Sequence, residues 1–171
     1  YGTNFKTQVS PFSDTEPGTV LLIHSDTTNG STTFTDSSGG AVKNTTGNIN
    51  SYVSANTTYG QSIVTYSGNG TAGQTVGHGL GTVPEMIIVK KLDSTDNWAV
   101  HHANANASSP EDYHFYLDAI SAATDNHVQF HDTLPTSSVF TIGDNDQVNH
   151  SSGTYVAYCW DSVAGYSKFG S

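Results

Sequence analysis

The sequence predicts an all-β protein: an antiparallel β-sandwich, of jelly-roll or lectin-like type, with an extended N-terminal arm. Three observations predict this class. Short apolar segments recur roughly every 10 to 15 residues, a spacing typical of sandwiches with about seven to nine strands. Turns that contain Gly, Asn, Asp or Pro separate these segments. Residues that favour long helices are scarce, with one Met and 5 Lys or Arg in the whole chain.

The composition excludes several kinds of partner. The chain has 171 residues, with 5 Lys or Arg against 15 Asp or Glu, and a formal net charge of -10. Nucleic acids and anionic membranes are bound by clustered basic residues, so we expect no nucleic-acid partner. No run of roughly 20 apolar residues is present, so we expect no membrane insertion. The single cysteine, Cys159, lies in an apolar run, which indicates a buried side chain rather than a reactive thiol.

Residues 1–58 are predicted to form an extended arm with a short β-hairpin. Residues 20–24 and 32–35 are the two expected strands. Asn29-Gly30 between them is a strong hairpin signal, because both residues tolerate positive φ. The remainder of the arm is polar and has too few apolar side chains to bury a core of its own. We therefore expect neighbouring subunits to order the arm.

Residues 59–171 are predicted to form the sandwich. The first expected strand is 62–66, which ends at a Gly-rich turn, and the second is the short segment 74–78. Residues 85–91 form a nearly continuous apolar run, which is typical of a central strand that is buried on both faces. Residues 97–102 follow after a turn rich in Asp and Ser.

The second half of this domain continues the same pattern. Residues 112–117 alternate between apolar and polar side chains, as a strand does. Residues 126–131 are predicted to be a strand with Val128 and Phe130 on one face and three polar side chains on the other. The remaining expected strands are 138–142, 154–160 and a closing edge strand at 166–169.

Asp144-Asn145-Asp146 is the best candidate for a metal site. Alternating carboxylates can present oxygen atoms to Ca²⁺, although the segment lacks the glycine that an EF-hand loop requires. The alternative interpretation is a solvated loop. The histidines show no helical pair with a third ligand nearby, so we expect no other metal and no organic cofactor.

Catalysis is not expected. A retaining glycosidase needs two carboxyl groups about 5–5.5 Å apart, and no two of Glu16, Glu85 and Glu111 share a predicted strand. The Gly-x-Ser-x-Gly signature of serine hydrolases is absent. These patterns predict a protein that is not an enzyme.

Trp98 with His101 and His102 is the candidate glycan-binding group. A Trp ring on the outer face of a strand could stack on a sugar ring, and Trp98, beside the two histidines, is the preferred exposed aromatic residue. Successive side chains of a strand point to opposite faces, so His101 and His102 are expected on different sides of the sheet. The alternative for the aromatic residue is a place in the core.

Seven segments after residue 59 together resemble a module of tail-fibre-like and other virion structural proteins of tailed phages, especially marine ones. These segments are Ile63–Gly70, Val76–Gly81, Pro84–Lys90, Asn97–Val100, Pro135–Phe140, Tyr155–Trp160 and Gly165–Ser171. Earlier in the chain, Leu21–Asp26 and Gly30–Gly39 are similar to the opening of concanavalin-like lectin/glucanase domains of phage tail proteins.

The resemblance implies a virion structural protein, either tail-fibre or adhesin-like or a capsid-surface decoration, that acts through packing of subunits. It implies localisation in the virion, an extracellular particle. The expected partners are other copies of this chain, with a trimer favoured, and other virion proteins. The alternative that it implies is a lectin-like carbohydrate-binding module that recognises polysaccharides of the host surface.

Overall fold

The computed structural model describes residues 23–25, 34–36 and 40–170. The chain divides into two compact units, Tyr1–Gly40 and Ala41–Ser171. In the first unit, β1 (Ile23–Ser25) pairs antiparallel with β2 (Phe34–Asp36). The rest of the predicted hairpin, including Asn29-Gly30, lies outside the described residues.

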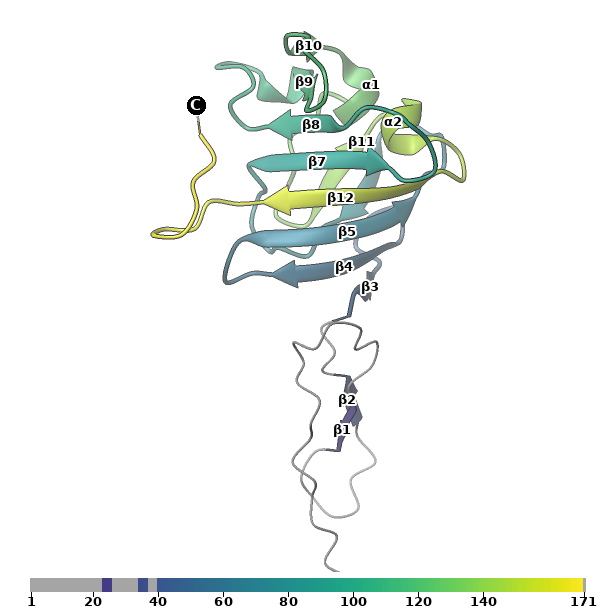
Figure 1. The fold of residues 1–171 in the computed structure, drawn as a ribbon, viewed down its shortest axis with the longest axis vertical. Coiled ribbons are helices and arrows are strands. Elements are labelled where there is room, and N and C mark those ends of the chain that lie inside the picture. The colour runs from purple at the N-terminus through teal and green to yellow at the C-terminus, as the bar shows by residue number, and fades with distance from the viewer. Residues whose placement is uncertain (1–22, 26–33, 37–39, 171) are drawn as a thin grey trace, which may run out of the picture. The chain divides into compact units, whose positions relative to one another are not determined.

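The second unit is built on one antiparallel sheet of eight strands (Figure 1). Across the sheet, the strands follow the order β10-β9-β8-β7-β12-β5-β4-β3. Their bounds are β3 (Val42–Asn44), β4 (Ser51–Asn56), β5 (Gln61–Ser67), β7 (Met86–Lys91), β8 (Ala99–His102), β9 (Tyr113–Tyr116), β10 (Thr124–Asp125) and β12 (Thr154–Trp160). The last of them, β12, lies between β5 and β7 and is antiparallel to both.

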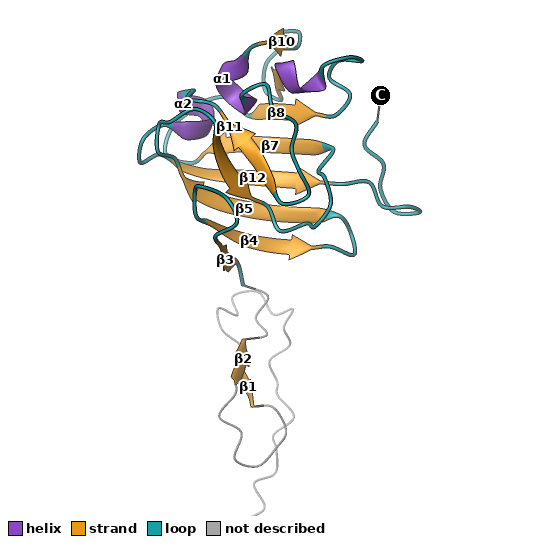
Figure 2. Cartoon of the chain, turned by 180° about the vertical axis from the view of Figure 1, so that it is seen from behind, coloured by secondary structure: helices purple, strands orange, loops and turns teal. Residues whose placement is uncertain are grey.

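A second layer covers one face of this sheet. It contains the antiparallel pair β6 (Gln74–Gly77) and β11 (Val139–Ile142), which Figure 2 shows crossing the large sheet. The short helices α1 (His127–Phe130) and α2 (Asp146–Asn149) and the 3-10 turn η1 (Pro110–Asp112) complete the described elements. The fold is therefore the all-β, antiparallel sandwich that the sequence predicted. None of the described helices is long and apolar enough to cross a membrane.

The core lies between the two layers. The large sheet contributes the inward side chains of its central strands, such as Val64, Val89 and Ala157, all fully buried. The second layer contributes Phe140 and Val148 among others. Strict alternation of exposed and buried residues along β5 places Val64 on this face and Ile63 on the opposite one. Apolar burial of this kind is the main driving force for folding.

The boundary between arm and sandwich differs from the prediction. Residues 41–58 were expected to belong to the arm, but they form β3 and β4 at the edge of the large sheet, where β3 pairs with β4 and β4 pairs with β5. Only Ile49 and Val53 from this segment are buried in the core. An edge strand exposes much of its surface, so its composition is polar although its backbone is part of the sheet.

Two predicted strands are wrong. Residues 126–131 form α1 rather than a strand: the Asn126 side chain caps the helix by accepting a hydrogen bond from Val128 N at 3.0 Å. His131 ends the helix in the left-handed region, at φ 55°, and its N–H donates to His127 O. The expected edge strand at 166–169 is a loop, held by an isolated bridge between Val163 and Ser167.

Cys159 is fully buried on the inner face of β12, as its apolar surroundings predicted. Burial raises the pKa of this thiol to about 12. We therefore expect no reaction with a thiol reagent such as dithionitrobenzoate at pH 8 in the folded protein, and full reaction in guanidinium chloride. Rapid labelling without denaturant would contradict this packing.

Candidate functional site: the open face of the eight-stranded sheet

The face of the large sheet that points away from the second layer carries no other described element across β7, β12, β5 and β4 (Figure 1). We call it the open face. Large apolar side chains lie exposed on it, with Tyr52 53% and Ile63 50% exposed. Three other outward side chains, Ile88, Val100 and Val156, are nevertheless buried. Their larger neighbours on the same face therefore cover part of the sheet.

Four aromatic residues form a row on the open face, which we call the aromatic row: Trp98, Tyr158, Trp160 and Phe169. Trp98 and Tyr158 stack with ring centroids 6.4 Å apart and planes 16° apart, and Tyr158 and Trp160 are 5.9 Å and 15° apart. Phe169 continues the row at 6.2 Å and 31° from Trp160. All four rings are partly exposed. Nearly parallel rings of this kind offer an apolar surface to a ligand.

Backbone hydrogen bonds fix the Trp98 end of the row. Trp98 N donates to Asp118 Oδ1 at 3.1 Å, while Leu117 N donates to Trp98 O at 3.1 Å. These bonds hold the residue before β8 against the end of β9. The ring is thus placed by the backbone of the sheet and its connections rather than by a free loop.

At the other end, Phe169 N donates to Ser162 Oγ at 3.0 Å. Ser162 is itself bound to the Glu85 carboxylate, which accepts from its backbone N at 3.1 Å and also from its hydroxyl group. The segment after β12 is therefore tied to the start of β7. This connection brings Phe169 back against Trp160.

The three predicted glycan-binding residues do not come together. Trp98 and His102 belong to the open face, whereas His101 is 1% exposed on the inner face, so the predicted opposite orientation of the two histidines is confirmed. His102 Nδ1 accepts from Asn104 N at 3.0 Å. The residues that complete the row with Trp98 are Tyr158 and Trp160, which sequence spacing alone did not connect with it.

His101 instead lies beside the Phe130 ring, at a centroid distance of 5.6 Å. Neither of its ring nitrogens has a hydrogen-bond partner among the described residues. Burial lowers the pKa of this imidazole to about 4, and the nearby His102 acts in the same direction, while Glu111 opposes it. The side chain is therefore neutral at pH 7 and belongs to the core.

Asp144 and Asp146, the predicted Ca²⁺ candidates, flank the start of α2 rather than enclosing a cation. The Asn145 side chain between them caps the helix by accepting from Gln147 N at 2.9 Å. The Asp146 backbone carbonyl accepts from the Tyr155 hydroxyl at 2.6 Å. Among the described residues, no three His, Cys, Asp or Glu side chains are placed to hold one metal ion.

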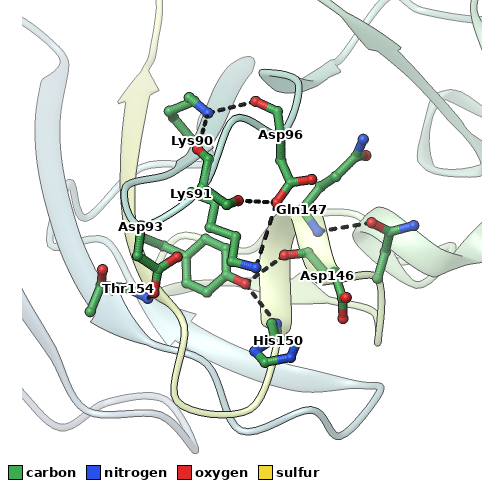
Figure 3. A network of polar contacts seen from close by, with 11 residues as sticks. Lys90, Lys91, Asp93, Asp96, Asp146, Gln147, His150 and Thr154 are labelled. Carbon is green, nitrogen blue, oxygen red and sulfur yellow. Dashed lines mark hydrogen bonds and ion pairs between the residues drawn. The ribbon is translucent and has the colours of Figure 1, made fainter.

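The same region holds the lysines at the end of β7 (Figure 3). Lys90 Nζ donates to the carbonyl oxygens of Ser94 and Asp96, and Lys91 forms an ion pair with the Asp96 carboxylate at 3.5 Å. The Ser94 hydroxyl and then Lys91 lower the pKa of Asp96. These contacts fold the β7–β8 connection back on its own strand and occupy both cations.

Comparison with known proteins identifies a family but no characterised relative. No curated protein and no solved structure matches this chain. One family does match, over residues 25–171, and it is described as a domain of unknown function. That match begins at the last residue of β1 and includes the whole eight-stranded sheet. The chain therefore belongs to the DUF7483 family, a domain of unknown function.

Proposed function

We propose that this chain is a non-enzymatic virion structural protein of a tailed phage, tail-fibre or adhesin-like or a capsid-surface decoration. One observation carries the proposal: the eight-stranded sheet is covered on one face and open on the other, with large apolar side chains exposed there. Contiguous exposed apolar surface usually marks a place where another molecule binds. The resemblance of the strand segments to phage virion modules supplies the setting.

The side chains that could have served catalysis have structural roles. Glu85 is bound to Ser162, and Cys159 is buried with a raised pKa. These roles support a protein that works through contact surfaces rather than through chemistry.

Localisation is the first test. Immunogold electron microscopy of purified particles, with an antibody against the full chain, is expected to label virions, and mass spectrometry of the same particles is expected to detect the chain. Label at the tail would support the adhesin-like form, and label over the head would support the decoration form. Particles that carry neither label nor peptide would overturn the virion assignment.

Self-association is the second test. We expect the full chain to form a symmetric oligomer, with a trimer favoured, because fibres and decorations act as closed assemblies of identical subunits. Sedimentation equilibrium or native mass spectrometry at micromolar concentration measures this directly. A chain that stays monomeric at the highest soluble concentration would argue against packing of identical subunits.

A second candidate function is a carbohydrate-binding module for host-surface glycans. The aromatic row favours it, because nearly parallel rings fixed on a rigid sheet offer apolar surface to the faces of sugar rings. Both functions are compatible in one adhesin. Retention of the full chain on isolated host-surface polysaccharide would support this candidate.

A further inference from the structure

A groove at one end of the open face adds a second feature to the aromatic row. It has a volume of about 460 Å³, and its lining includes Tyr52, Leu92, Thr65, Ser67 and Thr154. Tyr52 and Leu92 are 53% and 58% exposed. The three hydroxyl-bearing residues are also exposed, so the groove combines apolar walls with neutral hydrogen-bonding groups.

The groove and the aromatic row are connected along β12. Thr154 at the groove begins this strand, and Trp160 in the row ends it. At roughly 3.3 Å per residue, the two features lie about 20 Å apart. Between them, Val156 and Tyr158 face outward, and Tyr158 pairs with Ile63 of β5. The open face thus has a continuous path from the groove to the row.

The strands beneath the path contain no carboxylates, although Asp93 accepts from Thr154 N at one end and Asp118 accepts from Trp98 N at the other. The chain has 15 Asp or Glu residues, yet the strands β4, β5, β7, β8 and β12 contain none. Two strand lysines lie on this face: Lys90 is already occupied by two carbonyl oxygens, and Lys43 of the edge strand β3 lies opposite Tyr52. An uncharged occupant therefore meets no charged side chain on β4, β5 and β12, whereas an anionic one would meet a single strand lysine at the groove and carboxylates near both ends of the path.

The outward side chains that flank the path are neutral hydrogen-bonding groups. On β4 and β5 they include Ser54, Asn56, Gln61 and Thr65, all exposed. Of these residue types, Ser is depleted in protein–protein interfaces. Aromatic rings together with amide and hydroxyl groups match a sugar, whose ring has an apolar face and a rim of hydroxyl groups. These residues favour a glycan over a second copy of the chain.

We propose that the open face binds an uncharged polysaccharide in extended form, lying along β12 from the groove at Tyr52 to the aromatic row at Trp160. This proposal rests on the carbohydrate-binding candidate above and adds the charge class and the path of the ligand. It holds whether the chain is placed at the tail or on the capsid. Its failure therefore leaves the localisation test unaffected.

Affinity electrophoresis of the full chain in gels containing dextran, mannan or galactomannan tests the charge class, with the anionic polymers alginate and heparin as comparison. We expect retardation by at least one neutral polymer and none by the anionic ones. Trp160→Leu, which keeps apolar cover but removes the ring, is expected to weaken binding at least about tenfold. Ile120→Ala, at a fully exposed side chain outside the open face, serves as the matched control and is expected to change nothing.

An oligosaccharide ladder prepared from the retarding polymer tests the path. Affinity measured by calorimetry is expected to rise with chain length and then level off. Tyr52→Ala should weaken binding of the long oligosaccharides about tenfold and leave that of the shortest ones unchanged, whereas Trp160→Leu should weaken both. Equal loss in both variants at every length would overturn the extended path.

Two further outcomes would overturn the proposal. One is retardation by the anionic polymers only. The other is the absence of retardation by every neutral polymer, together with an oligomer that Trp160→Leu dissociates in sedimentation equilibrium. The second result would assign the open face to contacts between copies of this chain. A near-ultraviolet circular dichroism spectrum and a thermal melt of each variant establish that the fold is kept.

Discussion

Tyr155→Ala is expected to lower the free energy of unfolding by about 4 kcal/mol, a loss typical of a large aromatic side chain removed from a packed core. The ring is fully buried and stacks on Tyr66, with centroids 5.0 Å apart and planes 15° apart. Its hydroxyl group donates to Asp146 O and accepts from His150 N, both at 2.6 Å. Truncation would leave a cavity in the core and would also detach α2 from the sheet.

Urea unfolding of the wild-type chain and the variant, followed by Trp fluorescence, measures this loss. Tyr155→Phe keeps the ring and removes only the hydroxyl group, so we expect about 1–2 kcal/mol for it. Tyr166→Phe, at an exposed position, is the matched control and should stay within about 0.5 kcal/mol of wild type. If Tyr155→Ala costs no more than Tyr155→Phe, the ring does not contribute to the core as described.

Acid is expected to destabilise the sandwich by about 3 kcal/mol through His101 alone. Its pKa is about 4 in the folded chain, because burial disfavours the charged form, and about 6.5 in the unfolded chain. Below pH 6.5 the unfolded chain therefore binds more protons. The stability contributed by the neutral His101 is complete above about pH 6.5 and is lost as the pH falls towards 4.

Two other buried histidines act in the same direction. Burial lowers the pKa of His78 and of His114. In His78, Nδ1 accepts from Leu80 N at 3.2 Å and Nε2 faces the Thr136 carbonyl oxygen at 3.0 Å, so a second ring proton would remove the bond to Leu80. The total decrease in the free energy of unfolding in acid is thus expected to be larger than the decrease that is due to His101 alone.

Urea unfolding at pH 7.5 and at pH 4.5 measures the acid effect. In His101→Leu, the difference between the two pH values is expected to shrink by about 2–3 kcal/mol. Its stability at pH 7.5 should be equal to wild type or higher, because the substitution removes two buried nitrogens that have no partner among the described residues. His150→Gln, at an exposed side chain, is the control. An unchanged pH difference in His101→Leu would contradict the burial of this imidazole.

The fold class and the central strands could be predicted because the pattern of apolar and polar residues along each strand agrees with the burial of that strand in the folded sheet. In β5, Ser62, Val64 and Tyr66 alternate with exposed residues, and the buried face is visible in the sequence. The apolar run of β7 correctly predicted a central strand. The edge strands β3 and β4 could not be recognised, since strands that bury few side chains have the composition of an arm.

The helices were missed for a related reason. α1 and α2 each have four residues, too few for the 3.6-residue period to appear, and α1 happens to alternate polar and apolar residues as a strand would. Their caps are the local signals that could have indicated them: Asn126 and Asn145 each accept from the N–H two residues later. Asn145 caps α2, so the Asp-Asn-Asp segment that resembled a cation loop is the start of a short helix.

The candidate site depended on information that no local pattern contains. Trp98 was recognised as a binding candidate from its own segment. Its neighbours in the aromatic row, Tyr158 and Trp160, come from β12, and only the register between strands far apart in the sequence brings the rings together. His101 was grouped with Trp98 because it is near in sequence, although the pleat of the strand sends it to the opposite face.

The central position of β12 has a consequence for biosynthesis. Before β12 has been synthesised, β5 and β7 lack their common partner, and both present unpaired backbone groups to the surroundings. The sheet then exists as two separate halves whose inner edges are long and apolar, which is the condition that favours aggregation of nascent chains. We expect the final fold to form only after translation has passed Trp160, and to form slowly, because each pairing of β12 joins residues distant in the sequence.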